Sequence, residues 1–283
     1  MSRHVDIGDT RLHVVERGAG GLPLLVVHGG PALDHHMFGD YLDALGDEFH
    51  LVLVDLRSQG LSDLAPPETW TLERMAEDLS ELAAAMGFDR YATLGHSYGA
   101  FVVLQHAVEH VGEPAATIVS SGLPSARYLA AVQDNLATFE PVELRQQVTE
   151  SWGREAEART QADCEALLHE QLPFHFADPL DPRIEEFERR TAGGVYAPDL
   201  LRHFAVAEYG GIELEDRLGD VTHPVLVLAG RHDRTCVVEG GEAIAAGIPG
   251  AQLAIFEASA HMTFAEENDA YVSAVRRFLQ SVP

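Results

Sequence analysis

Short apolar runs, bounded by glycine, proline or polar residues, recur along the chain. Runs without polar–apolar alternation are typical of strands that are buried on both faces of a parallel sheet. Such runs lie at 22–27, 50–56, 91–95, 116–120, 224–230 and 251–257. Residues 10–17 alternate in part, which predicts a strand nearer the edge of the sheet.

Helical periodicity fills the intervals between these runs. In 70–88 the apolar residues form one stripe, Thr71 is a suitable N-cap, and Gly87 is a suitable stop. Further helical stretches are expected at 33–49, 100–111, 239–246 and 268–281. This alternation predicts an α/β fold with a doubly wound, mostly parallel sheet, in which ligands sit at the carboxyl ends of the strands.

The alternation of strands and helices stops between residues 124 and 220. This acidic segment has no strand-like run and reads as several helices, at 128–139, 142–157, 161–172 and 182–191. We interpret 124–220 as a helical cap inserted into a core domain formed by 1–123 and 221–283. A chain of 283 residues suits one α/β domain with such an insertion.

The charge of the chain excludes some classes of partner. There are 45 acidic against 19 basic residues, a formal net charge of −26, and every basic residue is Arg. Nucleic acids and anionic membranes bind clustered positive charge, so we expect neither as a partner. We attribute the acidity to solubility. The two cysteines, Cys164 and Cys236, form no disulfide framework or metal motif, so we expect no metal or cofactor. The polar N-terminus and the lack of a long apolar run predict a cytoplasmic protein.

Ser97 lies in the pattern Gly95-His96-Ser97-Tyr98-Gly99, between a predicted strand and a predicted helix. A strand-to-helix turn this tight leaves no room for a Cβ on either side of the serine, and it lifts the hydroxyl above the sheet edge. Ser97 is therefore the predicted nucleophile. We expect His96 to support the turn.

The loop His28-Gly29-Gly30-Pro31 follows another buried strand. A glycine-rich loop there can direct a backbone N–H at a developing oxyanion, and Pro31 has no N–H to offer. Gly30 and Tyr98 are the predicted oxyanion donors. His28 and Gly29 are predicted substrate-binding residues of this loop, and we expect His28 to hold the loop in place.

Asp233 and His261 follow the last two predicted strands. With Ser97 they stand in the order Ser, Asp, His, and the histidine can act as base while the aspartate orients it. Asp216 and Asp220 are alternatives to Asp233. The three side chains together predict attack on a carbonyl through an acyl-enzyme.

These motifs resemble the α/β-hydrolase superfamily. Within it, the 28–31 loop and the turn Asp55-Leu56-Arg57-Ser58-Gln59-Gly60-Leu61-Ser62 resemble the proline iminopeptidase family, as does the stretch from Phe204 to Tyr209. The resemblance implies release of an N-terminal residue from a short peptide, with Glu208 receiving the free amine. Glu185 and Glu186 are alternatives to Glu208.

Two other functions stay open. His-Ser-Tyr-Gly turns also occur in esterases and lactonases, which would take a small neutral acyl substrate. A ligand-binding member of the fold that barely turns over is a third possibility. Serine at position 97, where dehalogenases and epoxide hydrolases carry aspartate, disfavours those two classes.

Overall fold

A computed structural model describes residues 1–282, apart from the side chain of Glu208. Its centre is an eight-stranded sheet in the order β1-β2-β4-β3-β5-β6-β7-β8. The strands are β1 (Ser2–Asp6), β2 (Arg11–Arg17), β3 (Pro23–Val27), β4 (His50–Val54), β5 (Ala92–His96), β6 (Ala116–Ser120), β7 (Val225–Gly230) and β8 (Gln252–Phe256). Only the pairs β1–β2 and β2–β4 are antiparallel, which confirms the predicted mostly parallel α/β fold.

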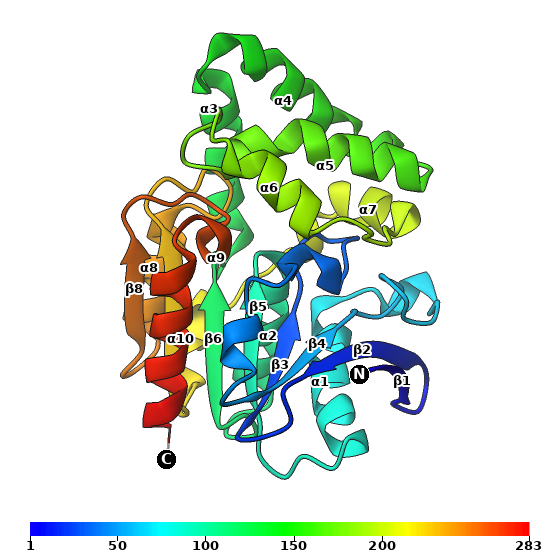
Figure 1. Cartoon of the computed structure of the whole chain (residues 1–283), viewed down its shortest axis with the longest axis vertical. Helices are drawn as coiled ribbons and strands as arrows, with labels where there is room; N and C mark the ends of the chain where they lie inside the picture. The colour runs from blue at the N-terminus through cyan, green and yellow to red at the C-terminus, as the bar shows by residue number, and fades with distance from the viewer. Residues whose placement is uncertain (283) are drawn as a thin grey trace.

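Helices cover both faces of this sheet (Figure 1). Alternate residues of β3 face opposite ways, so Leu25 and Val27 belong to one apolar core while Leu24 and Val26 belong to the other. The first core includes α1 (Leu72–Ala85), α2 (Tyr98–Glu109) and α8 (Val238–Gly247); the second includes α10 (Asn268–Ser281) and the turns η1 (His35–Phe38) and η2 (Asp43–Leu45). Central strands buried on both faces explain the continuous apolar runs in the sequence.

A group of helices lies between β6 and β7 in the sequence and sits above the carboxyl ends of the strands (Figure 1). Its members are η4 (Ala126–Leu129), α3 (Ala130–Thr138), α4 (Val142–Arg154), η5 (Glu155–Glu157), α5 (Gln161–His175), α6 (Arg183–Arg190), α7 (Pro198–Ala205) and η6 (Glu208–Gly210). We call these elements the cap. In this position they close over whatever the strand ends present. The turn η7 (Glu215–Asp220), just before β7, packs instead on the core against α8 and α2.

One predicted helix is wrong. Residues 33–49 form the two short 3-10 turns η1 and η2 instead of one α-helix. The chain turns at Gly39, whose φ is 46° and where a Cβ would lie 2.7 Å from the carbonyl oxygen of Arg190 in the cap. The apolar side chains of the segment are still buried, so the pattern located the core face but not the type of helix.

Three further elements differ from the prediction. Strand β1 is not predicted from the sequence, because most of its side chains are exposed at the sheet edge. Helix α7 is not predicted either, and it has only eight residues. Helix α5 continues past Pro173 to His175, beyond its predicted end at Leu172.

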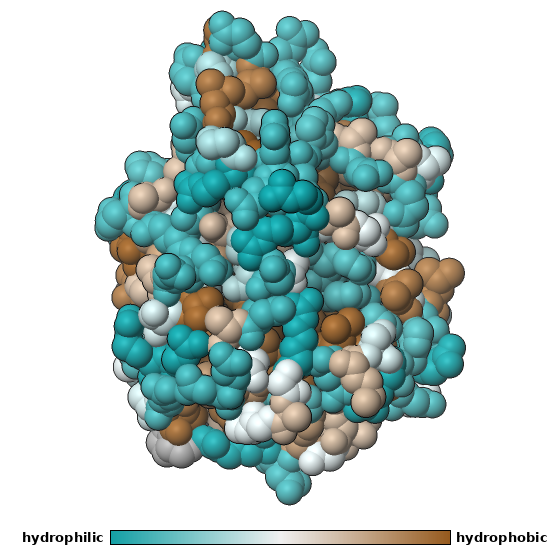
Figure 2. Space-filling model, viewed as in Figure 1, coloured by the Kyte–Doolittle hydropathy of each residue, from teal (hydrophilic) through white to brown (hydrophobic). Residues whose placement is uncertain are grey.

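The face of the molecule in Figure 2 is mainly hydrophilic, and apolar residues appear on it only in scattered groups. Many surface carboxylates pair with Arg, as in the contacts of Arg74 with Glu77 and Glu81. Within residues 1–282, no helix combines the length and the apolar character that crossing a bilayer would require.

Candidate functional site

Ser97 occupies the sharp turn between β5 and α2. Its φ of 55° and ψ of −120° are strained for a residue other than glycine. A Cβ on Gly95 would lie 2.0 Å from the carbonyl oxygen of Gly99, and a Cβ on Gly99 would lie 2.4 Å from that of His28. Glycine is therefore required on both sides of Ser97, which is the steric reason for the motif.

Asp233 and His261 meet beyond the ends of β7 and β8. Nδ1 of His261 lies 2.8 Å from Oδ2 of Asp233 and 3.0 Å from the hydroxyl oxygen of Thr235. Oδ1 of Asp233 accepts hydrogen bonds from the Thr235 hydroxyl at 2.8 Å, the Thr235 N–H at 2.9 Å and the Cys236 N–H at 3.0 Å. The carboxylate is held through both oxygens, and it orients the imidazole through Nδ1.

The environment of Asp233 keeps it ionised at neutral pH. Burial raises its pKa, but the attraction and hydrogen bond of His261, with the donors of Thr235, outweigh burial and hold the pKa below its ordinary value. The two alternatives considered from sequence, Asp216 and Asp220, are exposed in η7.

A cavity of about 120 Å³ lies between the sheet edge and the cap. Ser97, Thr235 and His261 line it from the core, together with Gly30 and Tyr98. Much of the remaining wall is apolar and includes Leu33, Met37, Phe101, Leu129, Val132, Leu167, Leu168 and Leu201. Ser97 and the oriented imidazole of His261 thus line one largely apolar space, which is comparable in size to an engineered cavity of about 150 Å³ that holds benzene.

Gly30 and Tyr98 border the cavity beside Ser97. Gly30 has a φ of 120°, which glycine adopts readily. Tyr98 is the first residue of α2, and the N–H groups of a helix's first turn have no acceptor within the helix. The Tyr98 phenol is buried and donates to Sδ of Met75 at 3.3 Å. The predicted oxyanion donors therefore both border the space that Ser97 faces.

His28 and Gly29 do not line the cavity. His28 is fully buried, its Nε2 accepts from the N–H of Leu56 at 3.2 Å, and burial lowers its pKa. A Cβ on Gly29 would lie 3.0 Å from Cβ of Ser97. These two residues shape the loop around Ser97, and the geometry gives neither of them a contact with the cavity.

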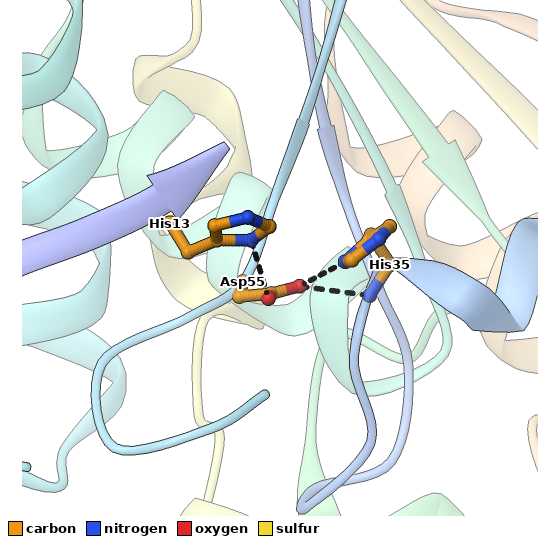
Figure 3. A group of neighbouring side chains, drawn as sticks. All are labelled: His13, His35 and Asp55. Atoms are coloured by element: carbon orange, nitrogen blue, oxygen red, sulfur yellow. Dashed lines mark hydrogen bonds and ion pairs between the residues drawn. The ribbon is translucent and has the colours of Figure 1, made fainter. Parts of the chain in front are cut away.

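Asp55, His13 and His35 form a second buried cluster (Figure 3). Oδ2 of Asp55 lies 2.9 Å from Nδ1 of His13, and Oδ1 lies 2.8 Å from Nδ1 of His35. The N–H groups of His35 and Leu61 donate to the same carboxylate. Burial raises the pKa of Asp55, but the hydrogen bonds of the His13 and His35 side chains and the charges of His28 and His35 outweigh burial and lower it. The three side chains are spaced closely enough to ligate a metal ion. Because four donors already satisfy the carboxylate, we interpret the cluster as a brace for the loops after β3 and β4.

Glu155 is a cavity residue that the sequence analysis missed. It is buried in the wall from the cap side, where the hydroxyl of Tyr209 donates to Oε2 at 2.5 Å and Nε2 of Gln171 donates to Oε1 at 2.9 Å. Burial raises its pKa, although both hydrogen bonds act in the opposite direction. Within residues 1–282 no Arg or His forms an ion pair with Glu155, so it is a buried acid without a cationic partner.

The carboxylates that the sequence analysis named in the cap lie elsewhere. Glu185 is exposed on α6, and Glu186 contacts Arg190 at 3.5 Å. Neither lines the cavity. The side chain of Glu208 lies outside the described part of the structure.

Two further imidazoles flank His261. The ring centroids of His96 and His175 each lie 5.0 Å from that of His261. Burial lowers the pKa of both flanking rings, that of His175 to about 3, so both are neutral near pH 7. His96 is the last residue of β5, and its Nδ1 lies 3.1 Å from the hydroxyl oxygen of Ser120 on the neighbouring strand β6. Its support of the turn stays a prediction.

Comparison with known proteins identifies relatives over nearly the whole chain. A proline iminopeptidase of Heyndrickxia coagulans is 26% identical over 275 residues, covering 94% of this chain and 93% of the relative. An α/β fold family hydrolase from Bacillus anthracis superimposes with a TM-score of 0.81 at 23% identity, covering 100% and 99% of the two chains. An enol-lactonase from Burkholderia xenovorans gives a TM-score of 0.75 at 21% identity, covering 99% and 100%.

The family-level match agrees with the fold. The sequence profile described as alpha/beta hydrolase fold matches residues 23–268, which include Ser97, Asp233 and His261. The sheet order and the helices on both faces give the architecture independently of that match. The chain belongs to the α/β-hydrolase family.

Proposed function

We propose that the protein is a serine hydrolase in which Ser97, His261 and Asp233 form a catalytic triad. One observation carries the proposal: His261, oriented through Nδ1 by Asp233, lines the same cavity as the strained Ser97. In this mechanism Ser97 attacks a carbonyl while Nε2 of His261 takes its proton. His261 then returns the proton to the leaving group, and Ser97 keeps the acyl group. In the second half, His261 takes a proton from a water molecule that attacks the acyl carbon, and gives it to the Ser97 oxygen as the acid leaves.

The N–H groups of Gly30 and Tyr98 are the proposed oxyanion donors. Both residues border the cavity next to Ser97, where negative charge would develop on the carbonyl oxygen. Neutral His96 and His175 add no positive charge beside His261, so imidazolium formation would not meet repulsion from them. Asp233, ionised and buried, would stabilise that imidazolium.

The substrate that we propose is a short peptide or aminoacyl derivative with a free N-terminal amine. The relatives named proline iminopeptidase support this class, and Glu155 supplies a chemical reason. A buried carboxylate without a cation is unfavourable, and a substrate ammonium would provide the missing charge and a hydrogen-bond donor. The apolar wall suits a small apolar side chain such as that of proline. Glu208 remains a second predicted amine acceptor.

An esterase or lactonase activity on a small neutral acyl group is the second candidate. The mostly apolar cavity wall favours it, and burial, by raising the pKa of Glu155, disfavours the charged form that an ammonium would pair with. Under this alternative the cavity would bind the acyl group through apolar contacts alone.

A panel of substrates separates the two candidates. Prolyl and alanyl aryl-amides, p-nitrophenyl acetate and a simple lactone are assayed on the wild type, Ser97→Ala, Glu155→Gln and the exposed control Glu185→Gln. We expect Ser97→Ala to abolish every activity. Glu155→Gln should raise KM for the aryl-amides by about tenfold or more, because a hydrogen bond to a charged group contributes roughly 1.5–3 kcal/mol.

The control variant and the ester substrate show whether the effect of Glu155→Gln is specific to amine recognition. Glu185→Gln should leave all constants within twofold, and Glu155→Gln should leave KM for p-nitrophenyl acetate unchanged. Glu208→Gln is assayed in parallel to assign the amine acceptor. If Glu155→Gln and Glu208→Gln both leave aryl-amide KM unchanged, the aminopeptidase proposal fails while the triad proposal stands.

A further inference from the structure

The C-terminal end of the cap helix α5 rests on the loop that carries Asp233. The guanidinium of Arg234 donates to the carbonyl oxygens of Phe174 at 3.0 Å and Phe176 at 2.7 Å through Nη1, and to that of Ala177 at 3.1 Å through Nη2. The last carbonyls of a helix have no partner within the helix and form its negative end, so a guanidinium is a suitable cap.

Arg234 is half-buried near Asp233 and Glu266, whose negative charges act on it, but its hydrogen bonds go elsewhere. Within residues 1–282 it forms no ion pair, and its described side-chain donors are directed at main-chain carbonyls. Burial lowers its pKa, yet a guanidinium remains charged in a protein. It does not line the cavity and so does not reach a substrate there. Burial of a cation that has no ion pair is unfavourable unless hydrogen bonds compensate for the lost hydration, so these contacts with main-chain carbonyls are expected to be important.

The carbonyl between these acceptors binds the loop of His261. The oxygen of His175 accepts from the N–H of His261 at 3.0 Å and from the N–H of Met262 at 3.3 Å. Arg234 therefore fixes the carbonyls on either side of the one that holds the main chain of His261. The ring of His175 also packs beside the His261 ring, which ties the imidazole to the same helix end.

Glu266 joins the end of α5 to the loop of His261 by a second route. Its Oε1 accepts from the N–H of Ala177, just after α5, and its Oε2 accepts from the N–H of Ala260, just before His261, both at 2.8 Å. Nη1 of Arg183, at the start of α6, donates to the Glu266 carbonyl oxygen at 2.5 Å. One carboxylate thus bridges the cap and the loop of His261.

We propose that Arg234 and Glu266 are positioning residues that clamp α5 onto the loops of Asp233 and His261, so that the orientation of His261 depends on the docked cap. This inference rests on the proposed triad. Its consequence is that the α5 end of the cap stays fixed during turnover. A substrate would enter without opening this side of the cap.

Arg234 could instead serve only to hold the cap on the core. Arg190 is a matched control for that role. Arg190 also joins the cap to the core, since its Nε donates to Oδ1 of Asp40 at 2.6 Å and its guanidinium lies 3.5 Å above the Tyr41 ring. Among residues 1–282, its side chain contacts Asp40, Glu186 and Tyr41, and none of these belongs to the loops of Asp233 or His261. Both arginines therefore dock the cap, but only Arg234 reaches the acid–base pair through α5.

The experiment compares Arg234→Met, Arg234→Lys, Glu266→Gln and Arg190→Met in the full chain. Hydrolysis of p-nitrophenyl acetate gives kcat and KM, a fluorophosphonate gives the rate of serine modification, and thermal unfolding gives Tm. We expect Arg234→Met to lower kcat and the modification rate at least tenfold with KM within twofold. Arg190→Met should change kcat less than twofold, and Arg234→Lys should recover part of the loss.

Each outcome decides between the two roles. Equal kcat values for Arg234→Met and Arg190→Met, at similar losses of Tm, would show that Arg234 only docks the cap. If Arg234→Met does not fold, Arg234→Lys and Glu266→Gln take its place: a loss of kcat of threefold or more in both supports the clamp, and wild-type kcat in both overturns it. Failure of the fluorophosphonate to modify the wild type would instead overturn the triad.

Discussion

The two walls of the cavity are built by different means. On the core side, Ser97 and Gly30 stand on turns that follow buried strands, and local sterics at Gly95 and Gly99 determine the geometry. On the cap side, Glu155 is placed by contacts with residues far away in the sequence, since Tyr209 is 54 positions away. In the proposed function, the core wall carries the groups that react and the cap wall carries the groups that select a substrate.

This contrast suggests that reaction and selectivity can change separately in this fold. Short motifs constrain the core wall, so substitutions there should affect turnover. Packing among short helices constrains the cap wall, so substitutions there should affect binding. Arg234 and Glu266 connect the two walls, so substitutions of these residues should affect turnover although they alter contacts with the cap.

The largest expected effect tests the core wall. Asp233→Asn keeps the shape of the side chain but favours the wrong tautomer of His261, and we expect kcat to fall by about 10⁴-fold, as the corresponding change does in chymotrypsin-like proteases. KM should change little, because Asp233 lies behind His261. Steady-state kinetics on the preferred substrate checks this. A loss below tenfold would mean that another group orients the imidazole.

The next effect tests the sterics of the turn. Gly99→Ala would place a Cβ 2.4 Å from the carbonyl oxygens of Val27 and His28, so we expect a loss of more than about 3 kcal/mol in the free energy of unfolding. Gly153→Ala is the matched control: it lies within α4 with open space around its Cβ, and should stabilise by about 0.5–1 kcal/mol. Urea unfolding measures both. Equal stabilities would refute the steric account.

Glu266, which links the cap to the loop of His261, is expected to make the stability of the fold depend on pH. Burial raises the pKa of Glu266 from 4.5 to about 7, despite the N–H groups of Ala177 and Ala260 and the nearby Arg183, while Asp181 adds to the rise. Because the folded pKa exceeds the unfolded value, the contribution of Glu266 to stability is complete below about pH 4.5 and is lost as the pH rises toward about 7. Each unit of pKa shift corresponds to roughly 1.4 kcal/mol.

Unfolding of the wild type and Glu266→Gln from pH 4 to pH 8 measures this contribution. The stability of the wild type relative to the variant should fall by about 3 kcal/mol across that window, and then stay level. A difference that is constant with pH would show that Glu266 titrates normally and is not desolvated as described.

Much of the fold and of the core wall of the cavity could be predicted from the sequence. Buried parallel strands leave continuous apolar runs, and the residues after those runs must meet at one sheet edge, which brought Ser97, Asp233 and His261 together. The same reasoning failed for 33–49, where Gly39 lies against the Arg190 carbonyl and breaks a helical pattern. It also missed Glu155, because in sequence this is one of many acids, and only the packing of Tyr209 and Gln171 makes it a buried one.

The most direct test of the triad is intact-mass and peptide mass spectrometry after treatment with a fluorophosphonate. We predict one adduct per chain, located on the peptide that contains Ser97. The adduct should be absent in Ser97→Ala and should form far more slowly in His261→Ala. An adduct on a different residue, or hydrolysis that persists undiminished in Ser97→Ala, would contradict the account.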